Sequence, residues 1–248
     1  QHLLIQSELK ENEPNKKMDE LVERLTKIKS LEEKLQHIRS KQDVAVNDTV
    51  DTISSMLPTL HTLCIGPGMG RHPLVFCAVQ RVLQKAMEIN MTIVLDADVL
   101  FMLSLNEYKS LLDELRSYER CVMTPNVMEL RRLNDALDIT TIATTTTTIA
   151  TEVKNSNIIV QKGHTDTIAN KHHTMHCEEE GGLKRSGGIG DVLAGTISAF
   201  MAWNTILSDD ATNQQQQKQR AFACWTACVA VKRATKLAYE KKRRSMGA

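Results

Sequence analysis

Residues 92–126 read TIVLDADVLFMLSLNEYKSLLDELRSYERCVMTPN, and their pattern indicates the fold class. Its two short apolar runs, 92–95 and 121–123, are each followed by polar residues, as is typical of buried strands. Residues 100–115, between the two runs, repeat apolar side chains at helical spacing. A strand, a helix and a second strand in this order predict two parallel strands joined by a crossover helix.

The same alternation continues on both sides of this stretch. We expect strands within 60–65 and 157–161, and helices over 73–89 and 127–137. The predicted fold class is therefore α/β, with a mostly parallel central sheet and helices on both faces. Ligands of such sheets bind at the carboxyl ends of the strands. The polar, glycine and proline residues expected at those ends are Gly66, Gly68, Gly70, Asp96, Asp98, Thr124, Pro125, Asn126, Lys162 and Gly163.

Composition indicates a soluble globular protein, which we expect to form one domain over residues 1–248. The chain holds 31 Lys and Arg against 30 Asp and Glu, so no net field draws it to nucleic acid or to an anionic membrane. No apolar run approaches the roughly 18 residues of a membrane span. The chain begins with Gln1 rather than Met, so we expect an excerpt of a longer protein. We predict a cytoplasmic location, or a mitochondrial one if a leader precedes Gln1, and a homo-oligomer is compatible with these features.

Residues 18–40 predict an amphipathic helix inserted in the domain, because apolar side chains recur there every three or four positions between charged ones. Ser30 and Glu33 match a capping box and predict a break between two helices near Ser30. The helix either lies on the domain or makes a short coiled-coil contact with a partner.

Four weaker signals lead to structural rather than catalytic predictions. The low-complexity tracts 140–151 and 214–217 are expected in surface loops. The histidine-rich run 172–177 is expected in a solvent-facing hairpin and not at a metal site, because adjacent residues of a strand point to opposite faces. The cysteines form no CxxC pair, which favours reduced core thiols over a disulfide framework: Cys64, Cys77, Cys121, Cys177, Cys224 and Cys228.

The stretch 184–195, KRSGGIGDVLAG, has the clearest chemistry, because three glycines precede a predicted helix with Val192, Leu193, Ile197 and Phe200 on its apolar face. The glycines leave backbone N–H groups bare at a positive helix start, which can hold a phosphate or a developing oxyanion. Asp191 could take a proton from a substrate hydroxyl during phosphoryl transfer. A purely structural helix cap remains the alternative. Neither the phosphate loop nor the dinucleotide fingerprint is matched.

Five motifs, in order, resemble the ATP-dependent NAD(P)H-hydrate dehydratases, a family with the ribokinase-like fold. They are CIGPGMGR (64–71), VLDADVL (94–100), TPNVMELRRL (124–133), VQKGHTDTIAN (160–170) and CEEEGGLKRSGGIGDVLAGTISAFMAW (177–203). The resemblance implies a repair reaction in which ATP phosphorylates the C6 hydroxyl of hydrated NADH or NADPH. Loss of phosphate then restores the reduced dinucleotide. It also implies ATP and Mg²⁺ as cofactors and the hydrated dinucleotide as the small-molecule partner.

The resemblance assigns roles to the residues that match its motifs. Asp191 would be the base, and the backbone amides of Gly188 and Gly190 would stabilise the transferring phosphoryl group. The residues implied for ATP are Lys162, Gly163, His164, Thr165, Asp166, Gly181, Gly182, Leu183, Lys184, Arg185, Ser186, Gly187, Gly188, Ile189 and Gly190. Those implied for the hydrated dinucleotide are Gly68, Gly70, Asn126, Val127, Met128, Glu129, Leu130, Arg131, Arg132 and Asp191. No residue is assigned as a metal ligand, although Asp96 and Asp98 would either contact magnesium or cap the following helix.

The sequence departs from the family in ways that keep two alternatives open. The family's opening strands and its glycine-rich segment have no counterpart, Val99 stands for a usual Gly, and Ser186 stands for a Cys. One alternative is a small-molecule kinase of the same fold, which Asp191 would serve equally well. The other is a non-catalytic binding or scaffold protein that uses helix 18–40. The motif TPNVMELRRL favours the dehydratase, because it belongs to the dinucleotide side of that family.

Overall fold

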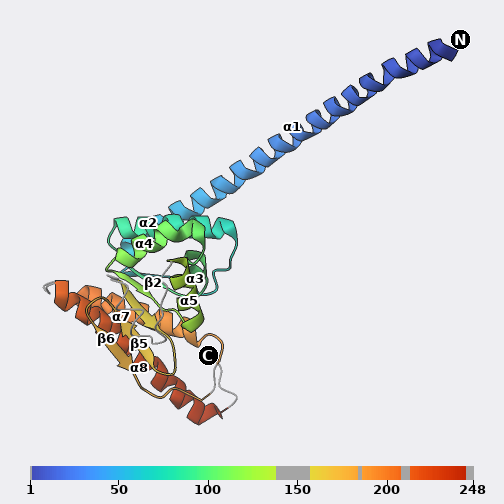
Figure 1. The fold of residues 1–248 in the computed structure, drawn as a ribbon. Coiled ribbons are helices and arrows are strands. Elements are labelled where there is room, and N and C mark those ends of the chain that lie inside the picture. The colour runs from blue at the N-terminus through green and yellow to red at the C-terminus, as the bar shows by residue number, and fades with distance from the viewer. Residues whose placement is uncertain (1, 138–156, 184–185, 208–212, 244–248) are drawn as a thin grey trace. The chain divides into compact units, whose positions relative to one another are not determined.

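The computed structural model describes residues 2–137, 157–183, 186–207 and 213–243, and the chain divides into two compact units, residues 1–49 and 50–248. The first unit is the greater part of one helix, α1 (His2–Met56), drawn in blue in Figure 1. The prediction of a single domain over 1–248 stays a prediction.

Helix α1 confirms the predicted helix but not the predicted break. The helix runs through Ser30 without interruption. The residues next to Ser30 are lysine, leucine and glutamate, all good helix formers, so a helix interior is favoured there over a cap.

The second unit contains a six-stranded sheet in the order β1-β2-β3-β4-β5-β6. Strands β1 to β4 pair in parallel, whereas β4, β5 and β6 pair in antiparallel fashion. This confirms the mostly parallel sheet. The strands are β1 (Thr62–Ile65), β2 (Thr92–Leu95), β3 (Cys121–Met123), β4 (Ile158–Gln161), β5 (Asp166–Ala169) and β6 (Thr174–Cys177).

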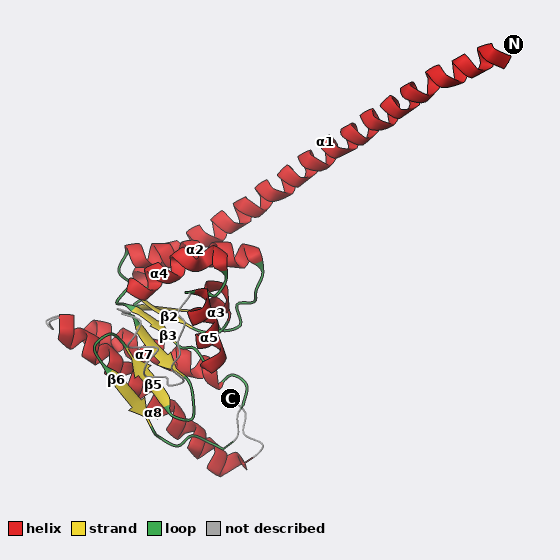
Figure 2. Ribbon diagram, in the orientation of Figure 1, coloured by secondary structure: helices red, strands yellow, loops and turns green. Residues whose placement is uncertain are grey.

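Helices cover both faces of this sheet, as Figure 2 shows. One face packs against η1 (Leu57–Thr59), α2 (Pro73–Glu88), α3 (Asp98–Leu103), α4 (Lys109–Ser117) and α5 (Val127–Ala136). The other face packs against α7 (Ile189–Leu207) and α8 (Asn213–Lys242). Strand alternation separates the two cores: Ile93 and Leu95 enter the first, and Val94 enters the second.

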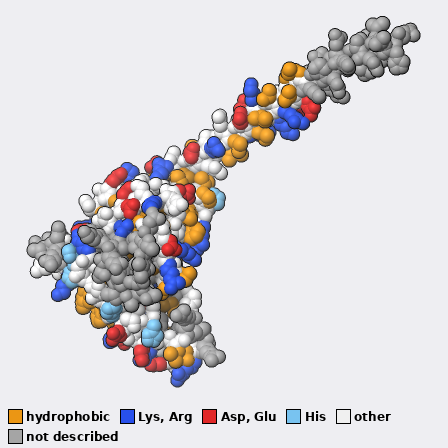
Figure 3. Space-filling model, viewed as in Figure 1, with side chains coloured by type: hydrophobic (Ala, Val, Ile, Leu, Met, Phe, Trp, Pro, Cys, Tyr) orange, Lys and Arg blue, Asp and Glu red, His pale blue; other side chains and the backbone are white. Residues whose placement is uncertain are grey.

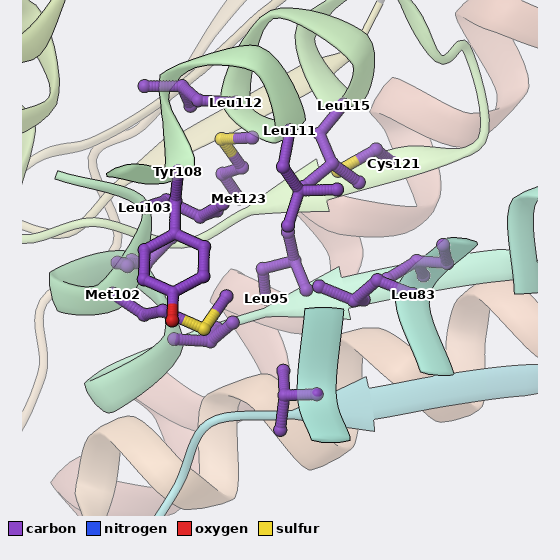
Figure 4. Close-up of a cluster of buried hydrophobic side chains, with 14 of the residues drawn as sticks. Leu83, Leu95, Met102, Leu103, Tyr108, Leu111, Leu112, Leu115, Cys121 and Met123 are labelled. Atoms are coloured by element: carbon purple, nitrogen blue, oxygen red, sulfur yellow. The ribbon is translucent and has the colours of Figure 1, made fainter. Parts of the chain in front are cut away.

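The first core is built mainly from leucine and methionine side chains, which converge from β2, β3 and the covering helices in Figure 4. The ring of Tyr108 belongs to this core and meets Phe76 edge to face, with the ring centroids 6.1 Å apart. The single helix expected over 100–115 is instead divided into α3, a short turn η2 (Asn106–Tyr108) and α4. The Ser104 hydroxyl donates to the Phe101 carbonyl and Leu105 is extended, so the backbone leaves the helix there.

Three further expectations need correction. Gln214 to Gln217 do not form a loop but open α8, where the buried Gln217 amide donates to Glu119 at 2.9 Å; glutamine is a good helix former. Val192 is 50% exposed rather than part of the buried face of α7. Four cysteines are buried, Cys224 and Cys228 among them, but Cys64 and Cys77 are exposed.

The tract 140–151 lies outside the described residues. Among the helices of the described ranges, none is long and apolar enough to cross a membrane.

Candidate functional site

The glycine turn after β1 is fixed against the residues that follow β2. Gly66 has a φ of 122°, and a Cβ there would lie 1.7 Å from the Asp96 carbonyl oxygen, so only glycine fits. The Gly70 N–H donates to Asp98 Oδ2 at 3.0 Å, and Arg71 Nε donates to Asp98 Oδ1 at 2.9 Å. Asp98 is the first residue of α3, so its carboxylate holds the turn 66–70 at the strand ends.

A largely buried ion pair joins the ends of β2 and β4. Lys162 Nζ donates to Asp96 Oδ1 at 2.6 Å, and the two side chains are 21% and 1% exposed. Opposite charges desolvated at this distance attract more strongly than a surface pair. A Cβ at Gly190 would lie 3.6 Å from Lys162 Nζ and 3.8 Å from Asp96 Oδ2. The first turn of α7 therefore lies directly against this ion pair.

The start of α7 is open to solvent on its outer side. Gly187 and Gly188 are exposed, Gly188 has a φ of 86°, and Asp191 is exposed in the first helical turn. Cys64 on β1 is exposed as a residue, but its sulfur is partly desolvated, and this desolvation raises the pKa of the thiol. A hydrogen bond with Ser198 opposes the increase, and the negative charges of Asp96 and Asp191 add to it. Asp191 directly follows Gly190, the residue that lies against the Asp96–Lys162 pair.

The turn between β4 and β5 is held by one carboxylate. The Gly163 N–H donates to Asp166 Oδ1 at 2.9 Å, and Lys232 Nζ of α8 lies 3.5 Å from Asp166 Oδ2. Lys232 also donates to the carbonyls of His164 and Cys177. Burial raises the pKa of Asp166, while the Gly163 N–H and Lys232 oppose that increase. Lys232 thus fixes the turn 162–166 onto α8.

These elements enclose a pocket of about 660 Å³, a volume suited to a small molecule such as a nucleotide. Nine residues implied for ATP by the sequence line it: Lys162, Gly163, His164, Asp166, Gly181, Gly182, Leu183, Ile189 and Gly190. Thr165, Ser186, Gly187 and Gly188 do not line it, and Lys184 and Arg185 lie outside the described residues.

The sequence analysis missed the wall that α8 contributes. It consists of Cys228, Val231, Lys232, Thr235, Lys236, Tyr239 and Glu240. The Gly182 N–H donates to Thr235 Oγ1 at 3.1 Å, and a Cβ at Gly182 would lie 2.5 Å from the Thr235 carbonyl. The strap 181–182 therefore needs glycine in order to pass over α8. Charged and aliphatic residues at helical spacing are typical of any solvated helix, so the sequence did not indicate that these residues line a pocket.

Seven of the ten residues implied for the dinucleotide, 126–132, lie at the start of α5. Asn126 and Glu129 form a capping box, in which Asn126 Oδ1 accepts from the Met128 and Glu129 amides and Glu129 Oε2 accepts from the Asn126 amide. A bridge between the backbones of Asn126 and Lys162 brings this helix start beside the ion pair. The side chains of Val127, Met128, Arg131 and Arg132 are exposed, whereas Leu130 is buried in the protein.

The fold and the site together define a class: a mostly parallel α/β protein whose nucleotide-sized pocket opens beside a glycine-rich helix start at the strand ends. A solved structure titled as a ribokinase-like superfamily protein, from Enterococcus faecalis V583, shares this fold. Its TM-score is 0.50 at 19% sequence identity, covering 77% of this chain and 66% of that one.

The sequence match is more specific. The family model described as NAD(P)H-hydrate dehydratase matches residues 21–247, and the chain belongs to that family. A relative from Entamoeba histolytica, named ATP-dependent (S)-NAD(P)H-hydrate dehydratase, is 33% identical over 207 residues, which cover 83% of this chain and 63% of the relative. A relative of the same name from Phaeosphaeria nodorum is 32% identical over 223 residues, covering 86% and 67%. The chain thus spans about two thirds of the length of these relatives.

Proposed function

We propose that the chain carries the catalytic face of an ATP-dependent dehydratase for hydrated NADH and NADPH. The observation that carries the proposal is the position of the α7 start. Its glycine-rich first turn lies against the buried Asp96–Lys162 pair, and Asp191 is exposed within that turn. Family membership supplies the substrate class, because the relatives are named for it.

In this proposal the pocket between α7, α8 and the turn 162–166 holds ATP. The γ-phosphoryl group would lie at the start of α7, where backbone N–H groups and the helix dipole favour negative charge. The Lys162 ammonium lies beside that turn and would neutralise part of the phosphate charge. The hydrated nicotinamide ring would lie between the turn 68–70 and the start of α5.

The proposed chemistry has two steps. As the substrate C6 oxygen bonds to the γ-phosphorus, its proton passes to Asp191 and ADP leaves. The C6–O bond then breaks with departure of phosphate, and a proton leaves the neighbouring ring carbon to restore the ring double bond. Phosphate is a far better leaving group than hydroxide, so elimination needs little further help. The backbone N–H groups of the α7 start, held in place at the phosphoryl group, would supply most of the rate enhancement.

Magnesium is expected to accompany ATP, and one carboxylate of the site fits it. No group of three metal-ligating side chains occurs among the described residues, but magnesium on a nucleotide usually takes only one or two carboxylates and binds phosphate oxygens and water besides. Asp96 fits such a ligand, because its Oδ2 faces the α7 start and its Oδ1 alone is bonded to Lys162. The ion would balance phosphate charge. Asp98 fits less well, since Gly70 and Arg71 occupy both of its oxygens.

The test combines the chain with ATP, magnesium and hydrated NADH and follows the absorbance of the reduced nicotinamide. Recovery of that band by the wild type, abolished in Asp191→Asn and retained in Asp135→Asn, supports the proposal. Asp135 is the matched control because it is an exposed aspartate on α5, outside the pocket. Turnover of ATP only with a different alcohol would favour a small-molecule kinase, and an absence of nucleotide binding would favour a binding or scaffold protein.

A further inference from the structure

An apolar stripe on α1 is exposed to solvent and has no role in the proposed reaction. We define the stripe as seven residues, Met18, Leu21, Leu25, Ile28, Leu31, Leu35 and Ile38. Each is between 50% and 61% exposed. In Figure 3 hydrophobic side chains are seen along this helix, with charged ones interspersed between them. Large apolar side chains gathered in this way mark an interaction surface.

The spacing of the stripe is symmetric about its central residue. From Met18 to Ile38 the successive intervals are 3, 4, 3, 3, 4 and 3 residues, which read the same in both directions. If a second copy of the helix is laid antiparallel with its Ile28 facing the first Ile28, every stripe residue meets another stripe residue. Met18 then lies level with Ile38, Leu21 with Leu35, and Leu25 with Leu31.

We propose that this stripe binds the same stripe of a second copy of the chain, as an antiparallel two-helix coiled coil centred on Ile28. In an antiparallel pair related by a two-fold axis, each patch must complement its own reverse, and a pattern that is unchanged on reversal meets this condition. A different protein would place no such demand on the spacing.

The charges of the segment agree with self-pairing. Residues 18–38 contain five acidic and four basic side chains, so two copies do not repel each other through net charge. The pairing about Ile28 brings Arg24 of one helix level with Glu32 of the other, twice per dimer. Glu23 and Glu33 also come level, but each lies about 140° around the helix from Ile28 and faces away from the interface.

The length and period of the stripe suit a short coiled coil. The six intervals between successive stripe residues span 20 positions, so they average about 3.3 residues. This average is less than the 3.6 residues per turn of a straight α-helix, so the paired helices should cross with a left-handed twist. The 21 residues equal three heptads and about 30 Å of helix. Residues around the stripe are good helix formers, which keeps the surface preformed.

The first test measures the molar mass of the full chain by sedimentation equilibrium over a range of concentrations. We expect a reversible dimer. Ile28→Asp should raise the dimer Kd by more than about tenfold, because it places two carboxylates face to face at the centre. Ser30→Asp is the matched control, since it adds the same charge about 160° around the helix from Ile28, and it should leave the Kd unchanged. Circular dichroism should confirm that both variants keep their helix content.

The second test separates antiparallel from parallel pairing by charge reversal. Arg24→Glu and Glu32→Arg should each weaken the dimer, and the double variant should restore the wild-type Kd. A parallel pair would bring Arg24 level with Arg24, so the double variant would show no rescue. The proposal is overturned if the wild type is a monomer at all concentrations, if Ile28→Asp dimerises as well as the wild type, if a different protein is needed for assembly, or if the rescue fails.

Discussion

Lys162→Met is the substitution for which the structure gives the most definite energetic prediction. Methionine keeps the length and the aliphatic character of lysine but removes the ammonium that pairs with Asp96 at 2.6 Å. The Asp96 side chain is 1% exposed, so its charge would remain in the protein without a counter-charge. Removing one partner of a buried ion pair typically costs about 3–5 kcal/mol of unfolding free energy.

The converse substitution should cost less. Asp96→Asn leaves the Lys162 ammonium, whose side chain is 21% exposed and can turn toward water. We expect a loss of about 1–3 kcal/mol, the range for an unsatisfied hydrogen-bonding group. The double variant should lose less than the sum of the two single losses, because neither charge is then left alone.

The assay is urea unfolding followed by the fluorescence of Trp203 and Trp225, both of which belong to the unit 50–248. Lys85→Met is the matched control, because Lys85 pairs with Glu88 at 3.0 Å while both side chains are more than half exposed. Such a surface pair should contribute about 0–1 kcal/mol. If Lys162→Met destabilises the protein no more than Lys85→Met does, the Asp96–Lys162 pair is not the buried interaction described above.

Two further predictions concern the pocket and the α7 start. Gly182→Ala should lower the affinity for a non-hydrolysable ATP analogue, measured by calorimetry, because its Cβ would lie 2.5 Å from the Thr235 carbonyl. Gly195→Ala is the control and should bind normally, because Gly195 lies in the interior of α7 and a Cβ there would meet nothing within 4 Å. If both variants bind alike, the strap does not shape the pocket. The Cys64 thiol, whose pKa is raised, should be alkylated by iodoacetamide half-maximally at a higher pH than free cysteine, and Asp191→Asn should move that midpoint downward. An unmoved midpoint would place Asp191 away from β1.

The sheet and the strand-end location of the site could be predicted from the sequence, because both follow from local patterns. Strands as short as 92–95 are marked by their apolar runs, and glycines such as Gly66 occur where the backbone must approach a neighbour closely. Two parts could not be predicted. The pairing of Lys162 with Asp96 joins residues 66 positions apart and depends on strand order. Gln214 to Gln217 were expected in a loop because of their low complexity, but glutamine is a good helix former, and the contact of Gln217 with Glu119 cannot be read from composition.

The predictions for α1 and α8 were incomplete for the same physical reason. In both helices the spacing of apolar and polar residues predicts the helix itself, but it does not show which part of the protein each helix face contacts. Thr235 and Lys232 of α8 look like ordinary polar residues of a solvated helix, and they gain their roles only from the turn 162–166 and the strap 181–182 folding onto them. Helix propensity likewise outweighed the capping box at Ser30.

In the proposed reaction, Asp191 takes the proton from the substrate hydroxyl while the α7 start holds the transferring phosphoryl group. The most direct measurement is the single-turnover rate of Asp191→Asn with ATP and hydrated NADH, together with its Kd for the ATP analogue. We expect a fall in the rate of about 10²–10⁴-fold, the usual contribution of a general base, with the nucleotide Kd unchanged. A rate equal to that of the wild type, or a loss explained entirely by weaker nucleotide binding, would contradict it.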